Sequence, residues 1–211
     1  MEGPFCVECG ALLEVPPPWR CTLCAGPLQA PESEAELPLC PPCRGHPPSY
    51  AKIAAPFVYG GAVAVAIHRL KYRGRREVTA PLATLIVVSA ADLLEAADLV
   101  VPIPLHPHRR RERGYDQATL LAREVARLAG RSFRPDLLRR TRENPRQVGL
   151  NRKERIENLQ GAFAADQGAK ERSVVVVDDV VTTGATAEAA SHALLAAGAR
   201  QVVVLAVARA M

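Results

Sequence analysis

Residues 174–186 have the sequence VVVVDDVVTTGAT, and this stretch decides the fold. Four consecutive valines are typical of a strand that is buried on both faces of a sheet, and we place that strand at 173–177. Gly184 opens a helix that runs to Ala197, and residues 201–207 form a second apolar strand. A strand, a helix and a strand in this order predict an α/β fold, in which helices flank a parallel sheet.

The residues before this stretch supply the rest of the expected sheet and its helices. Short apolar runs predict strands at 53–59 and 99–103. Apolar residues at helical spacing predict helices at 62–71, 80–97 and 115–130. No run of about 18 apolar residues is present, so we expect no membrane span.

Two acidic residues and a short loop follow the valines. Asp178 and Asp179, which we call the acidic pair, stand where the strand is expected to end. Ligands of parallel α/β sheets bind at this end of the strands, and a helix N-terminus favours anions. The carboxylates can accept hydrogen bonds from ribose hydroxyls or help to hold Mg²⁺. We therefore expect a sugar-phosphate site, with the phosphate held by a loop of Thr182, Thr183, Gly184, Ala185 and Thr186.

All six cysteines lie in three C-x-x-C pairs near the N-terminus. Two such pairs can close one tetrahedral zinc site. The first ten residues, MEGPFCVECG, lack a secretory signal, so we expect a cytoplasmic protein with reduced thiols. A Pro-rich segment of this size buries little core, and a structural zinc ion would stabilise it. We place zinc at Cys21, Cys24, Cys40 and Cys43, with Cys6 and Cys9 as an alternative pair.

The middle of the chain is strongly basic. Residues 69–155 carry 20 Lys and Arg against 10 Asp and Glu. This excess predicts polyanionic partners, either phosphates or nucleic acid. A stretch at 139–158 is basic and weakly periodic, and we expect a mobile loop or a hairpin there. A second group, the basic patch, could border the site or bind nucleic acid, and it comprises Lys71, Arg73, Arg75 and Arg76.

The 174–186 stretch resembles the 5-phosphoribosyl-1-pyrophosphate (PRPP) binding motif of type I phosphoribosyltransferases. Three more segments are similar to the ComF/ComFC family, including its GntX-like members: IHRLKYRG (67–74), VPIPLHPHRRRERGYDQA (101–118) and PRQVGLNRKERIENLQGAF (145–163). Members are competence-associated, phosphoribosyltransferase-like proteins with an N-terminal zinc-binding head. The resemblance implies a zinc-ribbon-like head at 1–48 and a phosphoribosyltransferase-like domain at 49–211.

The resemblance also implies residue roles. The acidic pair would contact the ribose hydroxyls and serve as the catalytic residues, the loop after it would wrap the 5-phosphate, and Mg²⁺ would accompany PRPP. Leu105–Arg113 would be a pyrophosphate loop in which Arg109, Arg110 and Arg113 bind, because arginine suits pyrophosphate oxygens. A mobile catalytic loop would carry Arg146, Arg152 and Arg155.

The chain departs from the family pattern at three places. Asp116 stands where the family often has Asn, and Val148 replaces a small hydroxyl residue. The head has three C-x-x-C pairs rather than four or two, which leaves the zinc stoichiometry open.

Three functions remain open from the sequence. The first is a transferase that moves the phosphoribosyl group of PRPP to an unidentified acceptor. The second is a competence factor that binds single-stranded DNA without turnover, alongside helicase-type competence proteins. The third is a regulator that senses PRPP or ribose 5-phosphate and docks a partner through its zinc head.

Overall fold

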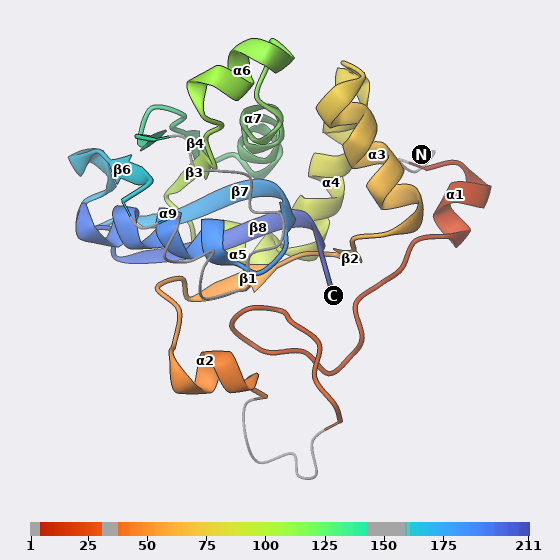
Figure 1. Cartoon of the computed structure of the whole chain (residues 1–211), viewed down its shortest axis with the longest axis horizontal. Coiled ribbons are helices and arrows are strands. Elements are labelled where there is room, and N and C mark those ends of the chain that lie inside the picture. Colours follow the sequence, from red (N-terminus) through yellow and green to blue (C-terminus); the bar gives the residue numbers. More distant parts are fainter. Residues whose placement is uncertain (1–4, 31–37, 143–158, 160) are drawn as a thin grey trace.

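The computed structural model describes residues 5–30, 38–142, 159 and 161–211 (Figure 1). Its centre is a six-stranded parallel sheet in the order β1-β8-β7-β3-β4, in which β2 also pairs with β8. The α/β prediction with a parallel sheet is therefore confirmed. The strands are β1 (Lys52–Ala54), β2 (Phe57–Val58), β3 (Leu99–Pro102), β4 (Ser132–Phe133), β7 (Ser173–Val181) and β8 (Gln201–Arg209).

Helices cover both faces of this sheet. In Figure 1, α3, α4, α6 and α7 lie above the sheet, and α2 lies below it. None of the described helices is both long and apolar enough to cross a membrane. The helices are α1 (Val7–Ala11), α2 (Pro41–Gly45), α3 (Gly61–Tyr72), α4 (Thr79–Ser89), α5 (Ala91–Glu95), α6 (Pro107–Arg113), α7 (Gln117–Ala129) and α9 (Ala185–Ala196), with 3-10 turns η1 (Arg76–Val78) and η2 (Gln167–Ala169).

The four valines of β7 explain why both faces are covered. Successive side chains of a strand point to opposite faces. Val174 and Val176 belong to a buried cluster that includes Leu194 of α9. Val175 and Val177 belong to a second buried cluster, formed with α3, α4 and α7. Each face of β7 therefore has its own apolar core.

The head packs on the same face as α9. Cys21, Cys24 and Cys43 are buried in the cluster that holds Val174 and Val176. The backbone N–H of Ile53 in β1 donates to the carbonyl of Leu23 at 2.7 Å. Apolar contacts and a main-chain hydrogen bond thus join the cysteine-rich segment to the edge of the sheet.

Several predicted elements have different bounds. The strand expected at 53–59 is two short strands, β1 and β2, because Pro56 has no backbone N–H to donate to a ladder. The helix expected at 80–97 is divided at Ala90, which leaves α-helical geometry with φ −136°. The strand expected to end at residue 177 continues as β7 to Val181, because β8 pairs beside it as far as Arg209.

A separate hairpin lies next to α9. Strands β5 (Leu138–Arg140) and β6 (Phe163–Ala165) pair in antiparallel fashion, with Arg139 opposite Ala164. The stretch 139–158, for which we expect a mobile loop or a hairpin, begins in β5, but its residues 143–158 lie outside the described part of the chain, so that expectation stays a prediction. Most of the connection between the two strands lies outside the described residues.

Candidate functional site

The acidic pair lies within β7 rather than beyond its end, which corrects the sequence-based placement. Strand β3 pairs with β7 only as far as Val177, so this side of β7 is open at the acidic pair. The side chains fold back onto the following backbone. Asp178 Oδ1 accepts the N–H of Asp179 at 2.8 Å, and Asp179 Oδ1 accepts the N–H of Val180 at 2.9 Å.

Lys71 of α3 forms an ion pair with the acidic pair, a contact that the sequence did not predict. Its Nζ lies 2.6 Å from Asp179 Oδ2, and the two side chains are 21% and 5% exposed. Sequence reasoning placed Lys71 with the basic patch because it is followed by arginines. The spacing along the chain does indicate a buried position: Lys71 follows Ile67 by four residues, so on a helix it lies on the same, buried face. A lysine on a buried face needs a partner, and Asp179 provides it.

The ion pair affects the pKa values of Lys71 and Asp178. Burial is the largest single effect on the Lys71 pKa and lowers it, but the charge and the hydrogen bond of Asp179, together with the charge of Asp178, outweigh burial and raise the pKa. Burial, together with the charge of Asp179, raises the pKa of Asp178 well above its ordinary range, although Lys71 works in the opposite direction. Asp179 is thus the partnered carboxylate. Asp178 holds its proton more tightly than an ordinary aspartate does, and when protonated it can donate a hydrogen bond as well as accept one.

The phosphate loop, residues 182–186, follows β7 directly and enters α9. Gly184 caps the helix with φ 83°, a left-handed conformation that favours glycine. A Cβ atom at this position would also lie 3.2 Å from Tyr50 Oη. Thr183 Oγ1 accepts the N–H of Ala185 at 3.4 Å. The other N–H groups of the first turn have no intrahelical acceptor, so the loop can bind an anion.

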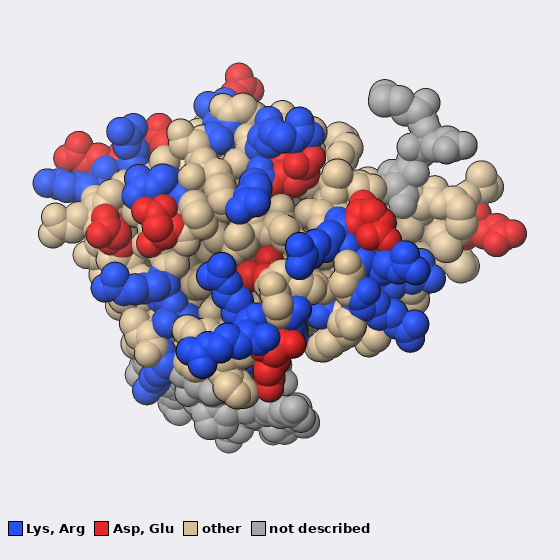
Figure 2. Space-filling view, turned by 90° about the horizontal axis from the view of Figure 1, so that it is seen from above, with Lys and Arg blue, Asp and Glu red and all other residues tan. Residues whose placement is uncertain are grey.

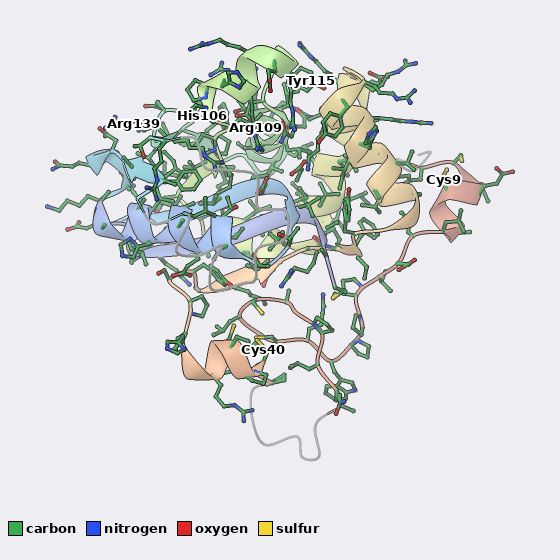
Figure 3. The ribbon with its side chains drawn as sticks, viewed as in Figure 1. Cys9, Cys40, His106, Arg109, Tyr115 and Arg139 are labelled. Atoms are coloured by element: carbon green, nitrogen blue, oxygen red, sulfur yellow. The ribbon has the colours of Figure 1, made fainter. Side chains whose placement is uncertain are left out.

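The expected pyrophosphate loop is mostly a helix. Residues 103–106 are irregular, but α6 begins at Pro107 and ends at Arg113, with His106 as its N-cap. Figure 3 labels Arg109 with His106 and Tyr115 in the region above the sheet. Proline at the first helical position and Gly114, with φ 74°, after the last are ordinary helix signals. The arginines of this segment are therefore held on a helix.

Asp116 has a defined structural role. Its carboxylate accepts the N–H of Leu105 at 2.9 Å and the N–H of Thr119 at 3.1 Å. It is thus the N-cap of α7 and also ties the 103–106 segment to that helix. Burial raises the pKa of Asp116, although both backbone donors oppose the shift.

The remaining arginines have separate contacts. Arg113 donates to Gln117 Oε1 at 3.1 Å, and its guanidinium lies 4.9 Å from the centroid of the Tyr72 ring. Arg76 lies over Tyr115 at 4.8 Å, and Arg75 forms an exposed ion pair with Glu77. Figure 2 shows Lys and Arg side chains spread over this upper face, with acidic groups between them. Of the basic patch, Lys71 is the member that reaches the acidic pair. The arginines predicted for the mobile loop, Arg146, Arg152 and Arg155, lie outside the described residues, as does Val148.

The structure brings together the four cysteines preferred from the sequence. One sulfur atom from each of Cys21, Cys24, Cys40 and Cys43 lies within 4.8 Å of the others. Cys24 Sγ and Cys40 Sγ are 3.6 Å apart. Four converging thiols that are largely buried fit the tetrahedral coordination of zinc, so this cluster could bind a zinc ion.

The thiol of Cys21 has a lowered pKa. Burial opposes its ionisation, but backbone N–H groups, first that of Cys24 and then that of Cys40, outweigh burial and lower its pKa to about 7. The alternative pair is elsewhere: Cys6 caps α1, and Figure 3 shows Cys9 at the edge of the molecule and Cys40 beneath the sheet.

A cavity of about 990 Å³ lies between α9 and the hairpin. Its lining includes His192 and Glu188 of α9, Phe163 of β6, and Lys170. Neither member of the acidic pair lines it. The acidic pair is therefore separate from this cavity.

No protein-family model matches the chain. The chain is similar to DNA utilization protein YhgH of Escherichia coli strain K12, with 30% identity over 177 residues that cover 82% of this chain and 78% of the relative. Competence protein F of Haemophilus influenzae is 30% identical over 179 residues, which cover 81% of this chain and 78% of that protein. Competence protein ComFC of Bacillus subtilis is 30% identical over 146 residues, with 67% of this chain and 57% of that protein covered.

Two solved structures are also similar to the chain. Glutamine PRPP amidotransferase of Bacillus subtilis, complexed with ADP and GMP, shares 21% identity at a TM-score of 0.43, over 65% of this chain and 30% of that one. The chain thus spans less than a third of the amidotransferase. The protein TT1426 of Thermus thermophilus shares 27% identity at a TM-score of 0.37, over 60% of this chain and 71% of that one.

Proposed function

We propose that this chain, which belongs to the family of DNA utilization protein YhgH and competence protein F, binds PRPP and transfers its phosphoribosyl group to an acceptor. The family supports a role in DNA uptake, where the acceptor would be a nucleotide-related molecule. We place this activity in the cytoplasm and assign residues 1–48 to a zinc-binding head and residues 49–211 to the transferase domain.

One observation carries the proposal: a partnered acidic pair borders an anion-binding loop. Lys71 Nζ lies 2.6 Å from Asp179 Oδ2, and Gly184 of the phosphate loop follows shortly after the end of β7. A phosphate at the start of α9 would leave the ribose near the open edge of β7. There Asp178 and Asp179 can accept hydrogen bonds from two neighbouring hydroxyls, and Lys71 lowers the cost of keeping Asp179 charged.

In the proposed reaction, the bond between ribose C1 and a pyrophosphate oxygen breaks, and a bond between C1 and the acceptor nucleophile forms. Pyrophosphate leaves with the bonding electrons. Mg²⁺ bound with PRPP would neutralise the leaving group. The residues of this chain bind and orient the sugar, and positioning of this kind can lower a barrier substantially. The exposed arginines of α6, Arg110 and Arg111, are suited to bind pyrophosphate.

Titration calorimetry with PRPP and Mg²⁺ tests the site. Asp179→Asn should weaken binding about tenfold or more, because a hydrogen bond to a charged group is worth about 1.5–3 kcal/mol. Gly184→Ala should weaken it at least as much, through backbone strain and the contact with Tyr50. Asp92→Asn on exposed α5 is a matched control, and so is Gly130→Ala, which has φ 63° but open space around it.

Turnover is tested separately, by release of pyrophosphate when PRPP is mixed with nucleobases, nucleotides or single-stranded DNA. If Asp179→Asn and Gly184→Ala both bind PRPP as tightly as the wild type, the assigned site is contradicted. Tight binding without pyrophosphate release under any condition would contradict the transferase and favour a PRPP sensor.

A second candidate, single-strand binding without turnover, is supported by the surroundings of Tyr72. The ring is 61% exposed, with Arg113 at 4.9 Å and the His68 ring at 4.8 Å from its centroid. Exposed aromatic rings in a basic groove stack nucleobases, at about 1–3 kcal/mol per base. Tyr72→Ala should weaken single-strand binding in a fluorescence anisotropy assay and leave PRPP binding unchanged.

A further inference from the structure

Arg209, at the end of β8, is a buried cation. Its residue is 7% exposed, and its guanidinium donates to three carbonyl oxygens: Nε to Cys24 at 3.1 Å, and Nη1 to Val181 at 3.3 Å and to Ala210 at 2.9 Å. Among the described residues, no carboxylate pairs with it. A buried charge is costly unless an opposite charge is near. A nearby anion would therefore offset the cost of burying the charge of Arg209.

The cysteine cluster can supply that anion. A Cβ atom placed on Gly26 would lie 3.3 Å from Cys24 Sγ and 3.8 Å from Arg209 Nη2. The thiol of Cys24 and the guanidinium thus face the same small space, which Gly26 leaves open. A zinc ion held by four thiolates keeps a surplus of negative charge, because four thiolates outweigh the charge of Zn²⁺. The charge of Arg209 is complementary to that surplus.

The same guanidinium reaches the phosphate loop. Val181, whose carbonyl accepts from Arg209, is the last residue of β7 before the loop begins. At the other end of the loop, the N–H and hydroxyl of Ser49 donate to Glu188 in the first turn of α9, at 2.9 and 2.6 Å. Tyr50 lies against Gly184 between these points. Residues next to the cysteine cluster therefore hold both ends of the loop.

We propose that Arg209 is a positioning residue that acts as the counter-charge of the metal-loaded cysteine cluster and, through Val181, braces the phosphate loop. Zinc bound in the head then favours the loop geometry that binds an anion. Loss of zinc leaves Arg209 buried without an anion and loosens the loop. The role of Arg209 as a counter-charge to the cysteine cluster does not depend on the proposed function. Its role in supporting the phosphate loop rests on the proposed phosphate site.

The counter-charge is tested without any phosphate ligand. Zinc release from the full chain is followed by competition with a chromogenic chelator. Arg209→Met should weaken zinc affinity about 10–100-fold, the usual range for partners of metal ligands. Arg209→Lys keeps the charge and should stay close to the wild type. Arg200→Met, at the other end of β8 in an exposed position, is the matched control and should have no effect.

Unchanged zinc affinity in Arg209→Met, or equal losses in the Lys and Met variants, would overturn the counter-charge. If the Met variant does not fold, the Lys variant decides, because a loss of zinc affinity there also contradicts the proposal.

The brace is tested by calorimetry with PRPP and Mg²⁺, before and after zinc removal by the chelator. In the wild type, removal of zinc should weaken PRPP binding several-fold. Arg209→Lys loses the hydrogen bond from Nη1 to the carbonyl of Val181 and should bind PRPP more weakly even when zinc is present. Ser49→Ala should also weaken PRPP binding while zinc affinity stays unchanged. Wild-type protein that binds PRPP equally with and without zinc would overturn the brace. Wild-type protein that never binds PRPP would instead contradict the proposed function and with it the brace, leaving the counter-charge result intact.

Discussion

The substitution Lys71→Met tests whether Lys71 is a partner of the acidic pair or an ordinary surface residue. At 2.6 Å, an effective dielectric constant of about 20 gives an attraction of about 6 kcal/mol between Lys71 and Asp179, before the cost of removing both groups from water. Removal of one partner of a buried pair costs about 3–5 kcal/mol. Because Lys71 is 21% exposed, water screens part of this interaction, and we expect a loss of about 2–4 kcal/mol.

The assay is urea unfolding at pH 7.5, with Lys52→Met on the exposed side of β1 as a matched control. A double-mutant cycle with Asp179→Asn isolates the pair, and we expect a coupling energy of at least about 1 kcal/mol. A loss no larger than that of Lys52→Met, or a coupling energy near zero, would refute the assignment of Lys71 to the acidic pair.

Three further predictions concern the remaining features. The pKa of Asp116 is raised by burial, so the wild-type unfolding free energy should fall as pH rises from the ordinary Asp range through the raised pKa. Asp116→Asn should lose that dependence in urea unfolding at several pH values, and it should cost about 1 kcal/mol because one of two backbone donors loses its acceptor. Cys21→Ser should lose zinc and lower the melting temperature, whereas Cys6→Ser should keep both, as measured by elemental analysis and calorimetry. Charge reversal of the three arginines of the basic patch should flatten the salt dependence of single-strand binding by about 0.7 per lost phosphate contact, and an unchanged slope would remove the patch from the DNA surface.

The core of the fold was predictable because its signals are local. The apolar runs of β7 and β8, separated by a helix that opens at Gly184, fix a parallel pair without reference to any other part of the chain. Helix α3 was likewise predictable from the spacing of Val63, Ile67 and Leu70. The four cysteines preferred from the sequence do lie together, so the cluster could bind a zinc ion.

The features that sequence reasoning missed depend on neighbours distant in the chain. The strand β7 extends to Val181 because β8 continues beside it, and the carboxylates of the acidic pair looked like a stop signal. The hydrogen bond from Arg209 to the carbonyl of Cys24 joins residues that are 185 positions apart. Helix α6 is the exception: Pro107 and Gly114 mark its ends, but the run of arginines suggested a loop.

Because side chains alternate along β7, the two members of the acidic pair face opposite sides of the sheet. Asp179 continues the series of Val175 and Val177, which face the cluster with α3, and it meets Lys71 from that helix. Asp178 continues the series of Val174 and Val176, which face α9 and the head. Two adjacent carboxylates on a fully paired strand could not meet one ligand. Strand β3 stops pairing at Val177, so on that side the acidic pair has no strand partner among the described residues, and the proposed ligand would reach both groups from there. The length of β3, rather than the end of β7, is therefore what makes a shared site geometrically possible.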